Sequence, residues 1–284
     1  MTDLTALRSG KTHKDENFPV AGLISARHRP AVLAFYDFVR TGDDIADHPT
    51  LPADEKIAAL DRMAAELRGD APASAVSAPL KAVLAERALS PQHALDLLDA
   101  FRLDAKKTRY TDWDDLIAYC RLSAMPVGRF VLDVHGESQA LWPANDALCA
   151  ALQIINHVQD CQKDYRALDR VYMPEDILAA FDASVPMLDL PQATPQLRAA
   201  LTHVVERTGE LLDDSRPFSH GIRDLRLACE VAAIQRLAER LNTGLLTRDP
   251  LADTVHASKA SFVMTASVAA LSRLIRHPFL RGQA

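Results

Sequence analysis

The chain has 284 residues, of which 48% are hydrophobic and 25% charged, and its formal net charge is −6. That apolar content is ample for a large core, and ten glycines without a Gly/Ser-rich linker favour a single domain over residues 1–284. Charges of both signs are interspersed and no basic stripe is visible, which argues against nucleic acid as a partner. No uncharged apolar run reaches ~18 residues, so no membrane-spanning helix is predicted.

The start of the chain and its cysteines indicate a compartment. The opening MTDLTALRSGKTHKDENFP contains acidic and polar residues and lacks the apolar region of a secretory signal. Cys120, Cys149, Cys161 and Cys229 have no paired spacing, which is typical of reduced thiols. We therefore expect a cytoplasmic protein whose residues 1–15 form a flexible N-terminus.

Helical periodicity dominates the chain, and its first clear examples are residues 52–69 and 112–136. Residues 52–69 carry apolar side chains at three-to-four spacing, acidic residues early and a closing glycine, Gly69. Residues 112–136 begin with acidic side chains suited to a helix N-terminus. Pro126 inside that stretch predicts a kink or break near Met125.

Three further long helices are predicted at residues 145–168, 195–214 and 222–244. The Pro-rich stretches 70–79 and 182–195 predict loops. Sustained period-two alternation and hairpin-turn dipeptides are missing. The pattern therefore predicts an all-α chain, larger than a four-helix bundle and without an internal repeat.

The acidic stretch GDDIADH (residues 42–48) follows directly on an apolar helical pattern. Asp43 and Asp47 lie four positions apart, so on a helix they share one face. Like charges at that spacing destabilise a helix, and a cation is therefore expected between them. Arg40 and Tyr36 continue the same face by one and two turns toward the N-terminus.

A second acidic stretch, NHVQDCQKD (residues 156–164), repeats this arrangement. Asp160 and Asp164 lie four apart, and Asn156 precedes them by one turn. Polar stripes so narrow among apolar residues are unusual for a solvated face. Three alternatives stay open from the residues alone: Mg²⁺ that also takes phosphate oxygens, surface charge, or another metal. The Glu-x-x-His signature of a di-iron centre is missing.

These stretches resemble the squalene and phytoene synthase group of trans-isoprenyl diphosphate synthases. FYDFVRTGDDIAD is similar to the first aspartate-rich motif, NHVQDCQKD with the following RALDRVYMPED to the second, and AYCRLSAMPVG (118–128) to the central helix. The motifs occur in the family's order over residues 16–245. The resemblance implies a class I isoprenoid (terpenoid) synthase fold: one large helical domain around a central apolar cavity, with residues 246–284 as a C-terminal helix.

The resemblance also implies roles for individual residues. Magnesium would be held by Asp43, Asp47, Asn156, Asp160 and Asp164, and the catalytic set would be Arg40, Asp43, Asp47, Asp160, Asp164 and Tyr172. The substrate's diphosphate would be bound by Asn17, Phe18, Tyr36, Arg40, Lys163 and Arg170. The cavity wall would include Phe35, Phe38, Tyr119, Met125 and Phe130, for each of which ordinary core packing is the alternative. Asp44, about 100° round the helix from Asp43, has no clear role.

The opening ENFPVAGLISARHRPAVLAFYDFVR resembles the hopanoid-pathway branch of this family. That branch converts presqualene diphosphate into hydroxysqualene, a lyase reaction for which NADPH is not expected. Leu122 stands where squalene-forming and dehydrosqualene-forming relatives often carry a tyrosine tied to the two-substrate condensation, and this fits a protein that starts from presqualene diphosphate. The alternative is a transferase that condenses two prenyl diphosphates head-to-head, as squalene and phytoene synthases do. Ala46 and Lys163 replace carboxylates that are frequent in relatives.

The C-terminal stretch SFVMTASVAALSRLIRHPFLRG (261–282) is apolar and then basic. It predicts either a buried final helix or a helix that lies on an anionic membrane surface, here the inner face. A pathway partner synthase and the oligomeric state are left open by the sequence. His13, His28 and His48 lack metal-ligand spacing and are expected to be exposed.

Overall fold

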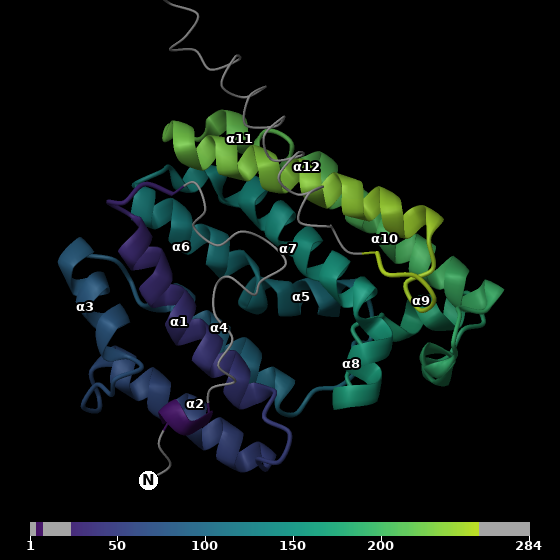
Figure 1. Cartoon of the computed structure of the whole chain (residues 1–284), viewed down its shortest axis with the longest axis horizontal. Coiled ribbons are helices and arrows are strands. Elements are labelled where there is room, and N and C mark those ends of the chain that lie inside the picture. Colours follow the sequence, from purple (N-terminus) through teal and green to yellow (C-terminus); the bar gives the residue numbers. More distant parts are fainter. Residues whose placement is uncertain (1–3, 8–23, 256–284) are drawn as a thin grey trace, which may run out of the picture. The chain divides into compact units, whose positions relative to one another are not determined.

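The computed structural model describes residues 4–7 and 24–255, and every regular element in these ranges is a helix (Figure 1). The only strand-like pairing among them is an isolated bridge between Tyr110 and Pro174. The chain divides into two compact units. Unit 1 comprises the described residues up to Lys107 together with Arg121–Gln139, and unit 2 comprises Thr108–Cys120 and the described residues from Ala140 onward.

Unit 1 is built around α1, against which the helices α2, α3, α4 and α6 pack (Figure 1). Its elements are η1 (Leu4–Leu7), α1 (Arg29–Ala46), α2 (Ala53–Arg68), α3 (Ala78–Arg87), α4 (Gln92–Asp104) and α6 (Met125–His135). The core includes fully buried side chains from several of these helices, among them Phe38, Leu60, Met63, Leu98 and Phe130. These apolar contacts fix the helix that carries the first acidic motif.

Close packing between α1 and α4 depends on a glycine directly before the first acidic motif. A Cβ atom on Gly42 would lie 2.8 Å from Cδ2 of Phe101 and 3.2 Å from Cδ2 of Leu98, both on α4. Glycine therefore lets the two helices approach closely at the residue next to Asp43. At the end of α1, Nζ of Lys56 donates a 2.7 Å hydrogen bond to the carbonyl of Ala46, which satisfies a terminal carbonyl group.

Unit 2 is built around α7, which packs against α10 and α12, and α10 and α12 also contact each other. Figure 1 shows the two in green along one side of this unit. Its elements are α5 (Trp113–Ser123, whose last three residues belong to unit 1), η2 (Gln139–Leu141), α7 (Trp142–Gln159), α8 (Cys161–Leu168), α9 (Glu175–Ala180), η3 (Val185–Asp189), α10 (Pro195–Ser215), α11 (Phe218–Gly221) and α12 (Leu225–Thr247). Side-chain oxygens of Thr194 and Asp224 cap the first turns of α10 and α12.

Most of the predicted helices are confirmed. The helix at 52–69 corresponds to α2, and the expected break near Met125 separates α5 from α6 at Ala124. The helix predicted at 145–168 is interrupted at Asp160, which ends α7 and precedes α8. The sequence patterns did not indicate α3 and α4.

Some expectations are wrong or lie outside the described residues. His28 was expected to be exposed, but only 8% of it is accessible, because its ring lies against the tilted ring of His135, with centroids 4.3 Å apart, and hydrogen-bonds to Arg87. The segments 1–15 and 261–282 lie outside the described residues, apart from η1. The single domain over 1–284 stays a prediction. No helix in the described part of the chain combines the length and apolar character needed to cross a bilayer.

Candidate functional site

The last turns of α1 present a half-buried polar stripe, formed by Tyr36, Arg40, Asp43 and Asp47, which we call the α1 stripe. The steps of four, three and four residues place these side chains on one helical face, as the sequence predicted. The helix itself ends at Ala46, and Asp47 is its C-cap residue, with a backbone N–H that donates to the carbonyl of Asp43 at 2.9 Å.

Arg40 pairs with both neighbouring carboxylates. One guanidinium nitrogen lies 3.0 Å from Oδ2 of Asp43 and the other lies 2.9 Å from Oδ1 of Asp44. The Asp44 side chain is only 3% exposed, whereas that of Asp43 is 35% exposed. Asp44 therefore anchors Arg40 from the buried side, and Arg40 in turn supplies the cation that the Asp43–Asp47 repulsion requires.

The Asp43 carboxyl group is electrostatically crowded. Burial raises its pKa to about 7, and the negative charges of Asp47, Asp104 and Asp44 act in the same direction, while Arg40 opposes them. The exposed third of the side chain screens part of this effect. A carboxyl group in such surroundings favours either a proton or an added cation.

Asp104 was not identified from the sequence. It is 8% exposed and ends α4, where the helix dipole disfavours a negative charge. An acidic residue at the C-terminal end of a helix is unfavourable, and this is the feature by which Asp104 could have been identified from the sequence. Together with Asp44 and Asp47, it adds to the negative charge around Asp43, which Arg40 opposes.

The second acidic motif occupies the junction of α7 and α8. Asp160 is the C-cap residue of α7 and the N-cap residue of α8, and Asn156 lies one turn earlier. Oδ1 of Asn156 is buried and has no hydrogen-bond partner among the described residues. A buried amide oxygen without a donor is costly, and it is also a suitable ligand for a hard divalent cation.

Lys163 makes a long ion pair at this junction. Its Nζ atom lies 3.7 Å from Oδ2 of Asp160, and its side chain is 73% exposed. A contact of that length at an exposed lysine contributes little to stability. Asp164 is half-buried in the first turn of α8, and its backbone N–H donates to the carbonyl of Asp160 at 2.8 Å.

Three buried tyrosines and the half-buried His157 form a ring cluster in unit 2. Tyr172 lies 5.4 Å from both Tyr110 and Tyr119, measured between ring centroids, and stacks on His157 at 3.4 Å with an interplanar angle of 13°. The segment with Tyr172 runs beside the segment with Tyr110, because the backbone N–H of Val171 donates to Thr108 and that of Glu175 donates to Tyr110.

Arg170 is buried beside the cluster, and one of its guanidinium nitrogens donates to the hydroxyl of Tyr172 at 3.4 Å. On the other side, the amide nitrogen of Gln153 lies 3.0 Å from Nε2 of His157. Burial, together with the positive charge of Arg170, lowers the pKa of His157 to about 3. His157 is therefore neutral at physiological pH. Neither Gln153 nor His157 was singled out from the sequence, although both continue the helical face of Asn156.

The predicted wall residues are all buried, Tyr119 in unit 2 and the others in unit 1. Phe35, Phe38 and Phe130 belong to its hydrophobic core, and the rings of Phe35 and Phe130 stack with centroids 4.0 Å apart. Met125 and Tyr119 are 6% and 4% exposed. These placements favour core packing, the alternative stated above, for the three phenylalanines. Asn17 and Phe18 lie outside the described residues.

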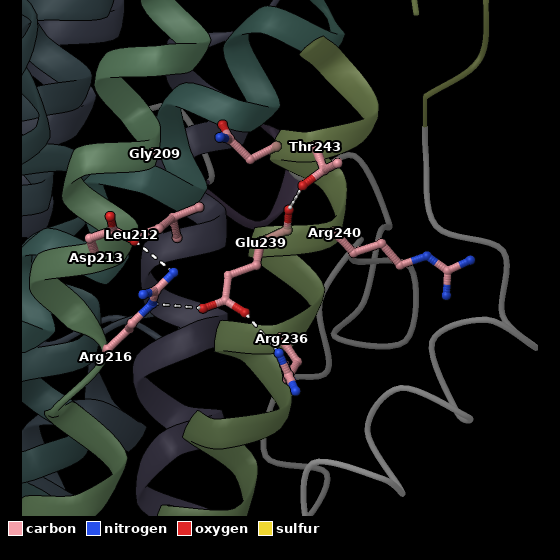
Figure 2. A pocket seen from close by; sticks show the side chains of 9 residues that line it. Gly209, Leu212, Asp213, Arg216, Arg236, Glu239, Arg240 and Thr243 are labelled. Carbon is pink, nitrogen blue, oxygen red and sulfur yellow. Dashed lines mark hydrogen bonds and ion pairs between the residues drawn. The ribbon is translucent and has the colours of Figure 1, made fainter. Parts of the chain in front are cut away.

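A hollow of about 510 Å³ opens on unit 2 between α10 and α12 (Figure 2). Arg216 at the end of α10 and Arg236 on α12 both point toward the carboxylate of Glu239, at 3.5 and 3.4 Å. The hollow is lined by Gly209, Leu212, Asp213, Arg216, Arg236, Glu239, Arg240, Asn242 and Thr243. None of these residues belongs to an acidic motif, so the hollow does not define the candidate site.

The helical architecture agrees with solved structures of isoprenoid synthases. A squalene synthase, HpnC, from Alicyclobacillus acidocaldarius superposes with a TM-score of 0.73 at 30% identity and covers 86% of this chain and 90% of its own. A dehydrosqualene synthase solved with a ligand gives a TM-score of 0.75 at 21% identity, with 89% of each chain covered. The fold is thus that of this class of enzymes.

The sequence comparisons place the chain within that class. The family model described as squalene/phytoene synthase matches residues 11–260, and the chain belongs to this family. A hydroxysqualene synthase of Rhodopseudomonas palustris is 53% identical over 99% of this chain and 97% of the relative. A second relative with the same name, from Zymomonas mobilis, is 48% identical over 95% and 92%.

Family membership gives the two acidic motifs a chemical context. The family is of the divalent-metal-dependent isoprenoid synthase type and acts on prenyl diphosphates, and the chain is accordingly a terpenoid synthase. The residues fit such a metal, because each unit carries carboxylates and unit 2 also offers the buried oxygen of Asn156, and oxygen ligands of this kind are those that hard cations prefer.

Proposed function

We propose that this protein releases diphosphate from presqualene diphosphate in a magnesium-dependent reaction, and that water then captures the rearranged carbocation to give hydroxysqualene. The observation that carries the proposal is the identity of about half of all positions, over nearly the whole chain, with relatives named hydroxysqualene synthase. Leu122 adds support, because the tyrosine tied to the condensation of two substrates is replaced there.

In this proposal each acidic motif contributes ligands for magnesium bound to the substrate's diphosphate. Asp43 and Asp47 are the ligands from the α1 stripe, and Asn156, Asp160 and Asp164 are those from the α7–α8 junction. Magnesium suits this role because it is usually held by few carboxylates and keeps positions open for phosphate oxygens. Bound magnesium would supply charge neutralisation of the leaving diphosphate.

The remaining polar residues bind and orient the diphosphate. Arg40 and Arg170 offer guanidinium groups that can grip phosphate oxygens in a bidentate fork, and the exposed Lys163 adds a point charge. Arg170 and Tyr172 are already held together in the structure, so ordering them costs little further entropy. Asn17, Phe18 and Tyr36 complete the proposed set.

One observation favours a second candidate. The HpnC structure that superposes over most of this chain was solved as a squalene synthase, and squalene formation requires hydride instead of water at the final step. In that case NADPH would be needed, and the same acidic motifs would serve the ionisation step. A head-to-head condensation of two farnesyl diphosphates belongs to this candidate as well.

Product analysis separates the candidates. The purified full-length chain is incubated with presqualene diphosphate and Mg²⁺, with and without NADPH, and the C30 product is identified by mass spectrometry. We expect an oxygenated product in both cases. A hydrocarbon that forms only with NADPH would establish the second candidate, and efficient conversion of farnesyl diphosphate alone into presqualene diphosphate would refute the role given to Leu122.

A further inference from the structure

The chain changes direction between Asp164, in the first turn of α8, and Arg170, which follows that helix. The change takes place at Asp169, the C-cap residue of α8, whose backbone is left-handed with φ 48° and ψ 33°. Residues other than glycine adopt this conformation at a cost, although aspartate tolerates it better than most. Beyond the turn, the backbone N–H of Arg170 donates to the carbonyl of Asp164 at 3.3 Å. The turn at Asp169 therefore determines how Asp164 and Arg170 lie relative to each other.

Arg109 holds this turn from the segment that precedes α5. One of its guanidinium nitrogens donates to the backbone carbonyls of Asp169 and of Thr108, the latter at 2.8 Å. The other nitrogen donates to Oδ1 of Asp169 at 2.6 Å. The side chain of Arg109 is 28% exposed, whereas that of Asp169 is 69% exposed. Arg109 therefore binds the backbone of the turn as well as an exposed carboxylate, and the backbone contact does not depend on which side chain occupies position 169.

A second attachment follows the turn directly. The backbone N–H of Val171 donates to the carbonyl of Thr108 at 2.9 Å, the same carbonyl that Arg109 binds. Arg170 lies between the two attachments, is 7% exposed, and donates to the hydroxyl of Tyr172 at 3.4 Å. Because the backbone is held on both sides of Arg170, its buried guanidinium is kept in a defined place. Supporting contacts of this kind fix the geometry of residues that bind a ligand.

We propose that Arg109 is a positioning residue, which acts by holding the left-handed turn at Asp169. The turn keeps Arg170 and Tyr172 in place relative to Asp164, so that the substrate's diphosphate meets them in a fixed geometry. The inference rests on the proposed function, from which the roles of these three residues are taken. A displacement of about 1 Å in a group that positions the substrate can lower a rate on the order of 100-fold, so a residue outside the site can have a large effect.

The alternative is that Arg109 and Asp169 form an ordinary exposed ion pair, which contributes little to stability and nothing to substrate binding. Two substitutions at position 169 separate the alternatives, because both remove the carboxylate. Glycine adopts the left-handed conformation freely, whereas valine is β-branched and strongly disfavours it. If only the ion pair counts, Asp169→Gly and Asp169→Val behave alike. If the turn counts, the valine variant is impaired and the glycine variant is not.

The experiment measures KM and kcat for pyrophosphate release from presqualene diphosphate with Mg²⁺, and the urea midpoint of the metal-free protein. For Asp169→Gly we expect kcat/KM within about threefold of the wild-type value. For Asp169→Val we expect kcat/KM to fall on the order of tenfold to a hundredfold, mainly through a higher KM, because the diphosphate loses a fixed partner. A purely structural role would shift the urea midpoint and leave both kinetic constants of the folded enzyme unchanged.

Substitutions of Arg109 provide a second test that leaves the turn residue as it is. Arg109→Met keeps the length of the aliphatic stem but removes the guanidinium group, and kcat/KM should fall as in Asp169→Val. Arg109→Lys keeps a charged donor and should retain more activity than Arg109→Met. Adding Asp169→Gly to Arg109→Met should recover part of the loss, because glycine adopts the turn without the help of the arginine.

Two results would overturn the positioning role. The first is unchanged kinetic constants in Arg109→Met, or in Asp169→Val if Arg109→Met does not fold. The second is an equal loss in Asp169→Gly and Asp169→Val, which would assign the effect to the carboxylate and not to the turn. If the wild type itself releases no pyrophosphate from presqualene diphosphate, the proposed function fails instead, and the two failures are therefore distinguishable.

Discussion

The end of α1 and the junction of α7 and α8 use the same acidic residues but hold them differently. On α1, Arg40 pairs with Asp43 and with the buried Asp44, so the motif brings its own cation. At the α7–α8 junction, Lys163 is mostly exposed and 3.7 Å from Asp160, and the oxygen of Asn156 has no hydrogen-bond partner among the described residues.

This difference shows how a fold can keep carboxylates together before any metal binds. Four carboxylates crowd unit 1, and their repulsion is relieved by Arg40 and by the raised pKa of Asp43, which lets a proton occupy that position. At the α7–α8 junction, Asp160 lies where one helix ends and the next begins, and the oxygen of Asn156 has no hydrogen-bond partner among the described residues. We therefore expect the first motif to release a proton when it binds a metal ion. We expect the second motif to bind the metal without such an exchange, so that losing one of its ligands has the larger effect on activity.

The largest expected effect is at the α7–α8 junction. Asp160→Asn keeps the shape of the side chain but removes the charge from a proposed metal ligand. Pyrophosphate release from presqualene diphosphate should fall on the order of 10²–10³-fold. The matched control is Asp213→Asn, a substitution at an exposed carboxylate on α10 that pairs with Arg216. Equal rates for Asp160→Asn and the wild type would remove the metal role of Asp160.

The next largest effect is expected on stability, when Asp44, the buried partner of Arg40 in unit 1, is replaced. Asp44→Asn leaves the guanidinium without its 2.9 Å partner in a site where the carboxylate is only 3% exposed. Losing one partner of such a pair should lower the free energy of unfolding by about 3 kcal/mol. Urea unfolding of the metal-free protein measures this. Asp43→Asn should change the free energy of unfolding far less. A similar loss in both variants would contradict the assignment of Asp44 as the residue that holds Arg40 and of Asp43 as a metal ligand.

A glycine in each unit tests how closely the helices pack. Gly42→Ala would bring a Cβ atom to 2.8 Å from Phe101, and overpacking of this kind should cost about 1–3 kcal/mol. Because Gly42 directly precedes the first motif, activity should fall together with stability.

Gly209 on α10 is the matched control in unit 2. An alanine Cβ there meets only Nδ2 of Asn242 at 3.4 Å, and alanine is the better helix former. Gly209→Ala should therefore leave stability unchanged or raise it by about 0.5 kcal/mol. Destabilisation of equal size at both positions would show that the cost at Gly42 does not come from the close approach of α1 and α4.

The smallest effect is the pH dependence that Asp43 confers. Its carboxyl pKa in the folded chain, about 7, is higher than the ordinary value of 3.8, so the folded state binds a proton more tightly than the unfolded state does. The contribution to stability is present at low pH and is lost as pH rises through about 7. Metal binding requires the ionised form, so affinity should weaken by up to about tenfold for each pH unit below 7.

Two measurements on the metal-free and metal-loaded protein check this. Mn²⁺ titration between pH 6 and 8 should release protons, and Asp43→Asn should abolish that release. Urea unfolding of the metal-free wild type should show a stability that declines between about pH 4 and pH 7 and then levels off, and Asp43→Asn should lack this decline. Proton release that persists in the variant would assign the titration to another group.

Much of the local structure follows from short-range patterns in the sequence. The spacing of Asp43 and Asp47, and of Asn156, Asp160 and Asp164, follows from helical periodicity, and the break before α6 follows from Pro126. The family could be predicted as well, because its motifs are short and occur in a fixed order. These features depend on residues that are near one another in the chain.

Tertiary structure alone decided the electrostatics and the immediate partners of the motifs. Asp104 reaches Asp43 only because α4 packs on α1, and the stacking of His157 on Tyr172 joins a helix to a distant loop segment. Burial, and with it the pKa of Asp43 and of His157, depends on which helices cover a side chain, and helical periodicity carries no information about that cover. The sequence thus determined which residues share a face, and the packing determined what each face meets.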